Sequence, residues 1–262
     1  MELISHADDL GLSKSIDDAI LQAAWAGHLS RVSCLVTHLH PTKPTPYALP
    51  STIECCLHFN ATEGTPIADP TTIPSLLNRA GQFYSLPAFL IRIGRGKIRE
   101  IDLERELTAQ LERFREIFGH YPTHLDSHQH SHLTRLVGNV LWSVGSKFSL
   151  ETVRTAPLIV YPGTSGYTPR LLNHLLKSSY PRHRRDPHTP AALVDPRYLT
   201  HGTLAATLAS LPSDSLVEVI WHLSIRPQDT WRHRQFEMIM NPTTWQELAE
   251  HRINLYHKPD KK

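Results

Sequence analysis

The sequence has few cysteines, and their positions argue against a disulfide-stabilised scaffold. Only Cys34, Cys55 and Cys56 occur in 262 residues, and the last two are adjacent. A disulfide between neighbouring residues would be strained, and an odd number without a CxxC spacing fits neither a disulfide framework nor a zinc ribbon. We therefore expect small buried thiols that stay reduced in the cytoplasm.

Long apolar runs and a strong charge imbalance are also absent. No stretch approaches the ~20 apolar residues of a membrane span. The opening MELISHADDLG lacks the basic segment and apolar run of a signal peptide. The 27 basic and 25 acidic residues leave a formal charge of +2, which is too small to indicate a nucleic-acid partner. These absences predict a cytoplasmic protein that binds neither membranes nor nucleic acids.

Histidine, by contrast, is abundant, with 18 in the chain. Four of them, together with Asp126, crowd the segment HLDSHQHSH at 124–132. Imidazole and carboxylate groups bind divalent metals, and histidines also transfer protons and sense pH. In an extended strand Asp126, His128, His130 and His132 would share one side, so they could not all reach one ion unless the chain turned.

Apolar runs alternate with helical periodicity along the chain, which predicts one α/β domain with a parallel sheet over residues 1–262. The last ~35 residues could form a peripheral extension. Residues 60–100 show no clear pattern, and a loop of that length usually has a function or hides unrecognised elements. The basic tract at 181–188 is typical of a solvated loop. The expected strands are 2–5, 31–38, 52–59, 123–127, 150–155, 191–194 and 215–223, and the expected helices are 13–27, 102–118, 133–146, 167–178, 201–210 and 242–252.

Polar, metal-competent residues follow several of these strands. The ends of parallel strands meet at one edge of the sheet, where ligand sites are built, so these residues can converge. One Asp and two His suit a divalent metal with positions left for water and substrate. Each residue taken alone is more often structural, and it is their equivalent placement that favours a metal site. The residues concerned are Asp8, Asp9, His58, Asp126, His128, His130 and His222.

Three ordered motifs also resemble one known family. The segments ISHADDLGLSKSIDDAILQAAWAGHLSRVSCLV, CLHFNATEGTPI and PTHLDSHQHSH are similar to those of the YdjC-like carbohydrate deacetylases, which include chitooligosaccharide deacetylases. The weaker SLVEVIWH resembles a late strand of that family that ends in a histidine. The resemblance covers residues 3 to 225 and implies a distorted (β/α) barrel of the polysaccharide-deacetylase type.

The resemblance also implies roles for single residues. Asp9, His58 and His128 would be the metal ligands, and Asp8 the general base. His222 would be the acid, and Arg154 would orient the base or bind substrate. The sequence departs from the family at His6 and Leu10, in the HLS at 222–224 that replaces an HPG-like loop, and in ALVDPR at 192–197, where an acidic motif is not recognisable.

These observations predict a metal-dependent hydrolase that removes N-acetyl groups from mono- or oligosaccharides. Ligand chemistry suits zinc, whereas the resemblance implies magnesium for some members, and it makes a homodimer reasonable. Three alternatives remain open: a metal-dependent hydrolase of another amide or of a phosphoester, a non-catalytic saccharide-binding relative that keeps its metal, and a structural protein whose histidines sense pH.

Overall fold

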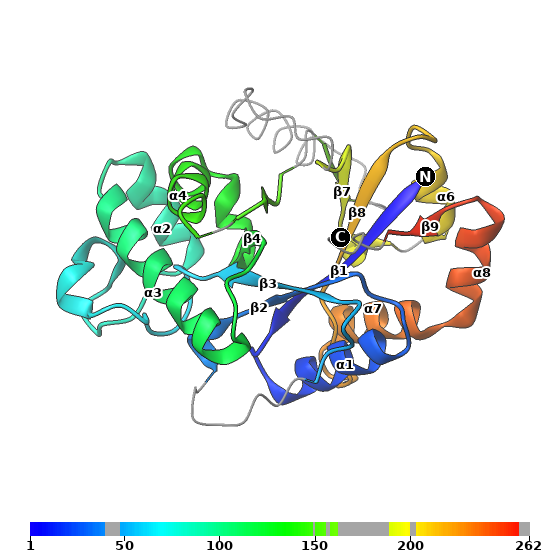
Figure 1. Ribbon diagram of the computed structural model, residues 1–262, viewed down its shortest axis with the longest axis horizontal. Helices are drawn as coiled ribbons and strands as arrows, with labels where there is room; N and C mark the ends of the chain where they lie inside the picture. Colours follow the sequence, from blue (N-terminus) through cyan, green and yellow to red (C-terminus); the bar gives the residue numbers. More distant parts are fainter. Residues whose placement is uncertain (40–47, 149, 156–157, 162–188, 200–202, 257–262) are drawn as a thin grey trace. The chain divides into compact units, whose positions relative to one another are not determined.

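The computed structural model describes residues 1–39, 48–148, 150–155, 158–161, 189–199 and 203–256 (Figure 1). The helix expected at 167–178 and the basic tract at 181–188 lie outside these residues. The chain forms two compact units, which are described separately below. The first unit comprises Met1–Val32, Tyr47–Glu54 and Thr155–Lys262, and the second comprises Ser33–Pro46 and Cys55–Arg154.

The first unit is built around the long strand β1 (Glu2–Leu10), in which every residue from Leu3 onward is buried. Such a strand is covered on both faces, as its continuous apolar start predicted. β1 pairs in parallel with β8 (Leu216–Trp221) (Figure 1). In this pairing His6 lies opposite Ile220. β8 pairs with β7 (Ala192–Val194), β7 pairs with β6 (Ile159–Val160), and β9 (Asn254–Leu255) pairs with β1.

Helices complete the first unit. α1 (Lys14–Trp25) buries an apolar face that includes Ile16 and Ile20, and it ends before Gly27, whose φ of 78° suits a helix terminus. The 3₁₀ turn η5 (Pro196–Tyr198) and α6 (Leu204–Ala209) follow β7. The last residues of the unit form α7 (Thr230–Met240), which packs on α1, and α8 (Pro242–Glu250), which precedes β9.

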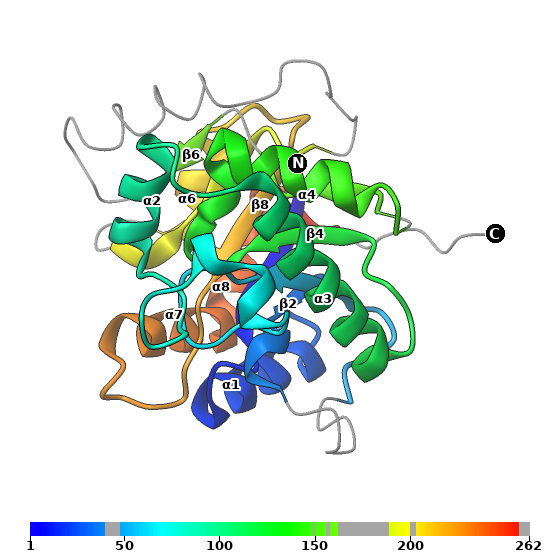
Figure 2. The same cartoon turned by 90° about the vertical axis from the view of Figure 1, so that its left-hand side faces the viewer.

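The second unit contains β3 (Glu54–Phe59) from Cys55 onward, β4 (His124–Ser127) and β5 (Thr152–Val153). These strands pair in parallel, with His58 opposite Asp126. α3 (Glu100–Phe118) packs against α4 (Arg135–Gly145) (Figures 1 and 2), and both helices agree with the predicted periodicity. The unit also contains η1 (Val36–His38), η2 (Pro70–Thr72), η3 (Pro74–Leu76), α2 (Leu86–Gly94) and η4 (His128–Leu133).

The strands follow the order β5-β4-β3-β2-β1-β8-β7-β6, in which β2 (Arg31–Cys34) has residues in both units. Parallel pairing with helical connections confirms the predicted α/β fold class. α2 was missed in the sequence because its short apolar run lies between Pro87 and Gly94. In the part of the chain that the structure describes, no helix has the length and apolar character needed to cross a membrane.

Candidate active site

Asp8 and Asp9 lie buried at the end of β1. Neighbouring side chains of a regular strand point to opposite faces. Here the backbone departs from regular geometry at Asp9, whose φ of 73° is left-handed, and again at Gly11, whose φ is 99°. The left-handed backbone thus begins at Asp9, before the glycine. This geometry lets two adjacent carboxylates take different roles.

Three cationic or titratable groups of the first unit face these carboxylates. Nη2 of Arg232, on α7, donates to Oδ2 of Asp9 at 2.7 Å. Nε2 of His222 lies 3.9 Å from Oδ2 of Asp8, just beyond the end of β8. Asp8 also lies 3.9 Å from Nε2 of His6, whose Nδ1 is 2.8 Å from Oε1 of Glu218. The first unit therefore brings Asp8, the predicted base, next to His222, the predicted acid.

His222 is neutral at neutral pH. Burial lowers its pKa from 6.5 to about 4, although Asp8, Asp9 and Asp195 act in the opposite direction. Its backbone N–H donates to Oε1 of Gln235 at 2.8 Å, and its ring lies 5.5 Å from that of Trp231. α7 thus supplies neighbours to His222 as well as Arg232 to Asp9. His222 can act as an acid only after it has received a proton.

In the second unit His58 belongs to a buried hydrogen-bonded chain. Its Nδ1 lies 2.6 Å from Oδ1 of Asp126. When Nδ1 donates to this carboxylate, a neutral ring has its lone pair on Nε2. Oδ2 of Asp126 accepts from Ser33 at 2.7 Å and pairs with Nη1 of Arg154 at 2.9 Å. A carboxylate on one nitrogen of a histidine is the usual support for a metal ligand that uses the other nitrogen.

The histidine-rich segment turns as soon as β4 ends. Gln129 and His130 have left-handed φ values of 53° and 55°, so the segment is not an extended strand and its histidines do not share one side. The ring of His128 lies 5.5 Å from that of His58, and its Nε2 lies 2.9 Å from Oε2 of Glu63.

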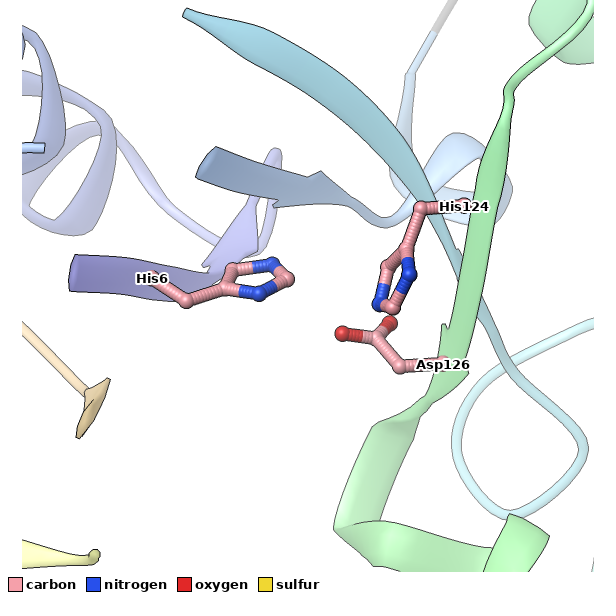
Figure 3. A group of neighbouring side chains, drawn as sticks. All are labelled: His6, His124 and Asp126. Carbon is pink, nitrogen blue, oxygen red and sulfur yellow. The ribbon is translucent and has the colours of Figure 1, made fainter. Parts of the chain in front are cut away.

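The remaining histidines of the segment have other surroundings. Nδ1 of His132 is 2.8 Å from the hydroxyl of Ser127, and burial lowers its pKa well below 6.5. His124 lies on the same side of β4 as Asp126, as Figure 3 shows, and its Nδ1 is 2.7 Å from the hydroxyl of Thr152. Figure 3 also shows the ring of His6 on β1.

Each unit therefore gathers part of the predicted set of residues. Asp8, Asp9 and His222 lie together in the first unit, whereas His58, His128 and Arg154 lie around Asp126 in the second. His and Asp side chains of both units are candidate metal ligands. Their chemistry suits a divalent cation, because His58 is already held through one nitrogen and Asp9 is a buried carboxylate.

Several neighbours of these residues had no assigned role in the sequence. Asp126 was visible within the histidine cluster, and its pairing register with His58 on the adjacent strand explains their contact. Glu63 follows His58 by five positions, but nothing in the sequence linked it to His128. Arg232 and Gln235 lie three residues apart on α7, outside every motif.

The comparisons with known proteins agree with the motifs. Residues 2–250 match the model of the YdjC-like protein family. The carbohydrate deacetylase of Geobacillus stearothermophilus is 36% identical over 156 residues, which cover 58% of this chain and 60% of that protein. The carbohydrate deacetylase of Danio rerio is 32% identical over 154 residues, with 59% and 49% covered. The chitooligosaccharide deacetylase of Yersinia pestis (strain Angola) is 33% identical over 137 residues, covering 50% of each chain.

The matched part of this chain spans about half the length of most of these curated relatives. A solved structure from Enterococcus faecalis, of a protein proposed to cleave cellobiose phosphate, has the same fold, with a TM-score of 0.72, 19% identity and coverage of 97% of this chain and 96% of that one. Together with the ordered motifs, the match over residues 2–250 shows that this chain belongs to the YdjC-like family.

Proposed function

We propose that this protein is a metal-dependent hydrolase that removes N-acetyl groups from amino sugars or chitooligosaccharides. The observation that carries the proposal is the pair of buried aspartates at the end of β1, with Asp8 3.9 Å from His222 and Asp9 bonded to Arg232. Membership of the YdjC-like family and relatives named as carbohydrate or chitooligosaccharide deacetylases support the choice of reaction.

Asp9, His58 and His128 would hold one divalent cation. The three residues are among the His and Asp combinations of this chain that suit a metal ion. His58 keeps its lone pair on Nε2 because Asp126 accepts from Nδ1. When bound, such a cation polarises the acetamide carbonyl and lowers the pKa of water. Magnesium and zinc are both compatible with an Asp-His-His set.

Asp8 would remove a proton from the attacking water, which requires an ionised carboxylate that is not itself a ligand. The leaving amine needs a proton, and His222 would deliver it. Because His222 starts neutral, with a pKa of about 4, that proton must first reach it, and Asp8 is the nearby source at 3.9 Å. The two residues would thus pass one proton from water to the amine.

Arg154 would act on the reaction indirectly, through Asp126 and His58. It is buried against Asp126, which in turn holds His58. We therefore propose a positioning role for Arg154 through Asp126. The two roles that the family resemblance implied, orienting the base or binding substrate, stay predictions. A homodimer and the choice of an N-acetylated saccharide remain predictions from that resemblance, and a cytoplasmic location remains a prediction from cysteine usage.

Acetate release from diacetylchitobiose tests the proposal. The purified protein, treated with chelator, is incubated with the sugar and either Mg²⁺, Zn²⁺, Co²⁺ or no metal, and acetate is quantified. We expect release that depends on metal and is lost in Asp9→Asn. Saccharide binding without acetate under any metal would identify a non-catalytic relative. Hydrolysis of a phosphoester such as p-nitrophenyl phosphate, without acetate release from the sugar, would show that the protein does not cleave the proposed amide bond.

A further inference from the structure

Helix α3 carries three polar side chains that face inward. Asp102, Glu106 and Gln110 are spaced four residues apart, so they lie on one face of the helix, and all three are fully buried. Buried polar groups need hydrogen-bond partners. We call these three residues the polar seam of α3.

The partners of the polar seam are backbone groups of the segment that follows β3. Gln110 accepts from the N–H of Asn60 at 3.0 Å and donates to its carbonyl at 2.6 Å. The two oxygens of Glu106 accept from the N–H groups of Ile67 and Ala68, each at 3.0 Å. Asp102 accepts from the N–H of Ser75 at 2.9 Å. The seam therefore anchors residues 60–75 along the helix.

Asn60 extends this anchoring to Glu63. Its side-chain oxygen accepts from the N–H groups of Thr62 and Glu63, and its amide donates to the carbonyl of Glu63 at 2.8 Å. The backbone of Glu63 is thus fixed, whereas 46% of its side chain is exposed. Oε2 of Glu63 accepts from Nε2 of His128 at 2.9 Å.

The two proposed histidine ligands, His58 and His128, are therefore held through opposite ring nitrogens. Asp126 accepts from Nδ1 of His58, but Glu63 accepts from Nε2 of His128. A neutral imidazole has one N–H and one lone pair, and a carboxylate acceptor determines which nitrogen keeps the proton. For neutral rings, these two contacts place the lone pair on Nε2 in His58 and on Nδ1 in His128.

We infer that Glu63 is a positioning residue, held in place by the polar seam through Asn60, that keeps the proton of His128 on Nε2 and presents Nδ1 as its ligand atom. The inference rests on the proposed function for the role of His128 as a ligand. The tautomer itself exists in the metal-free protein and does not depend on that role. Replacing a carboxylate that supports a ligand typically lowers metal affinity by ~10- to 100-fold.

The test uses metal-free protein labelled with ¹⁵N at histidine, in which long-range NMR correlations identify the protonated ring nitrogen at pH 7.5. His128 is assigned from the spectrum of His128→Gln. Wild type, Glu63→Gln and Glu63→Ala are compared with Glu250→Gln, which removes an exposed carboxylate on α8 as a control. Wild type and the control should show His128 protonated on Nε2. Glu63→Ala should shift it toward the Nδ1–H form, and Glu63→Gln, which keeps an acceptor oxygen, should shift it less.

Zinc titration of the same samples adds a second readout. When zinc binds, we expect the ¹⁵N shift of Nδ1 of His128 to leave the range of a nitrogen with a lone pair. We also expect Glu63→Ala to bind zinc at least ~10-fold more weakly than the control. A wild-type His128 protonated on Nδ1, or a tautomer unchanged in Glu63→Ala, would refute the role of Glu63. If no variant bound a cation, the proposed function would fail, and the metal-free spectra would still decide whether Glu63 sets the tautomer.

Discussion

Arg154 and Asp126 form an ion pair in which both side chains are 0% exposed and Nη1 lies 2.9 Å from Oδ2. Asp126 also accepts hydrogen bonds from Ser33 and His58. The pair therefore lies at the centre of the polar part of the second unit. Removing one member of such a pair leaves an uncompensated buried charge.

Arg154→Met should lower the free energy of unfolding by about 3–5 kcal/mol, because the carboxylate of Asp126 stays buried without its cation. Urea denaturation of the purified variant measures the loss. Arg95→Met, at an exposed arginine that follows α2, is the control and should stay within about 0.5 kcal/mol of wild type. Equal stability of the two variants would show that the ion pair contributes little.

The two adjacent aspartates should separate metal binding from turnover. Asp9→Asn should lose the metal, whereas Asp8→Asn should keep it while kcat falls by at least ~10², because the general base is missing. Metal content by elemental analysis and acetate release measure both effects. Full activity of Asp8→Asn would mean that another group is the base.

Arg232→Gln should strengthen binding of a divalent cation. Arg232 places a positive charge 2.7 Å from Oδ2 of Asp9. Charges of +1 and +2 about 6 Å apart in water repel each other by about 1.4 kcal/mol, so removing one of them corresponds to an affinity gain of about tenfold. Arg232→Lys keeps the charge and should bind like wild type. Calorimetry with Mg²⁺ or Zn²⁺ measures both, and weaker binding by Arg232→Gln would mean that orientation of Asp9 outweighs charge.

His222 should titrate with a pKa of about 4 in the metal-free protein, and Asp8→Asn should lower this pKa further, because the charge of Asp8 raises it. An NMR titration of the ring follows both. The unfolded chain binds this proton near pH 6.5 and the folded chain only near 4, so the free energy of unfolding should fall as the pH drops through that window. His222→Gln should show a smaller fall, whereas an unchanged pH profile would contradict the assigned pKa.

Glu106 predicts the opposite pH dependence. Burial raises its pKa from 4.5 to about 7, despite hydrogen bonds from Gln110, Ile67 and Ala68 that favour the ionised form. The folded state therefore binds the proton more tightly than the unfolded state, and stability should fall by up to about 3 kcal/mol as the pH rises from 4.5 past 7. Glu106→Gln should remove this slope in urea denaturation, while Glu116→Gln, at an exposed residue of α3, should keep it.

The strands that carry the motifs could be predicted because they are short and mostly apolar, as in β3, or rich in β-branched residues, as in β8. α3 could be predicted from its leucines. Its polar seam could not, since Asp102, Glu106 and Gln110 have the spacing of an ordinary solvent-facing stripe. Only the backbone groups of a distant segment, at Ile67, Ala68 and Ser75, make these side chains internal.

In the candidate site, too, some residues could be predicted from the sequence and others could not. Motifs indicated Asp8, Asp9, His58, His128 and His222 through residue type and position at strand ends. The groups that orient them lie outside the motifs or play roles that their spacing does not reveal. Glu63 meets His128 across 65 positions and Arg232 meets Asp9 across 223, so each contact depends on the folded chain. Local patterns carry no information on such pairs.

The hydrogen bonds between the polar seam and residues 60–75 also bear on how this part of the chain opens. Because each residue of the polar seam accepts a backbone N–H from that segment, the segment cannot detach without leaving buried acceptors empty on the helix. Helix and segment should therefore behave as one foldon, in which the amides of Ile67, Ala68 and Ser75 exchange with deuterium only when α3 itself unfolds.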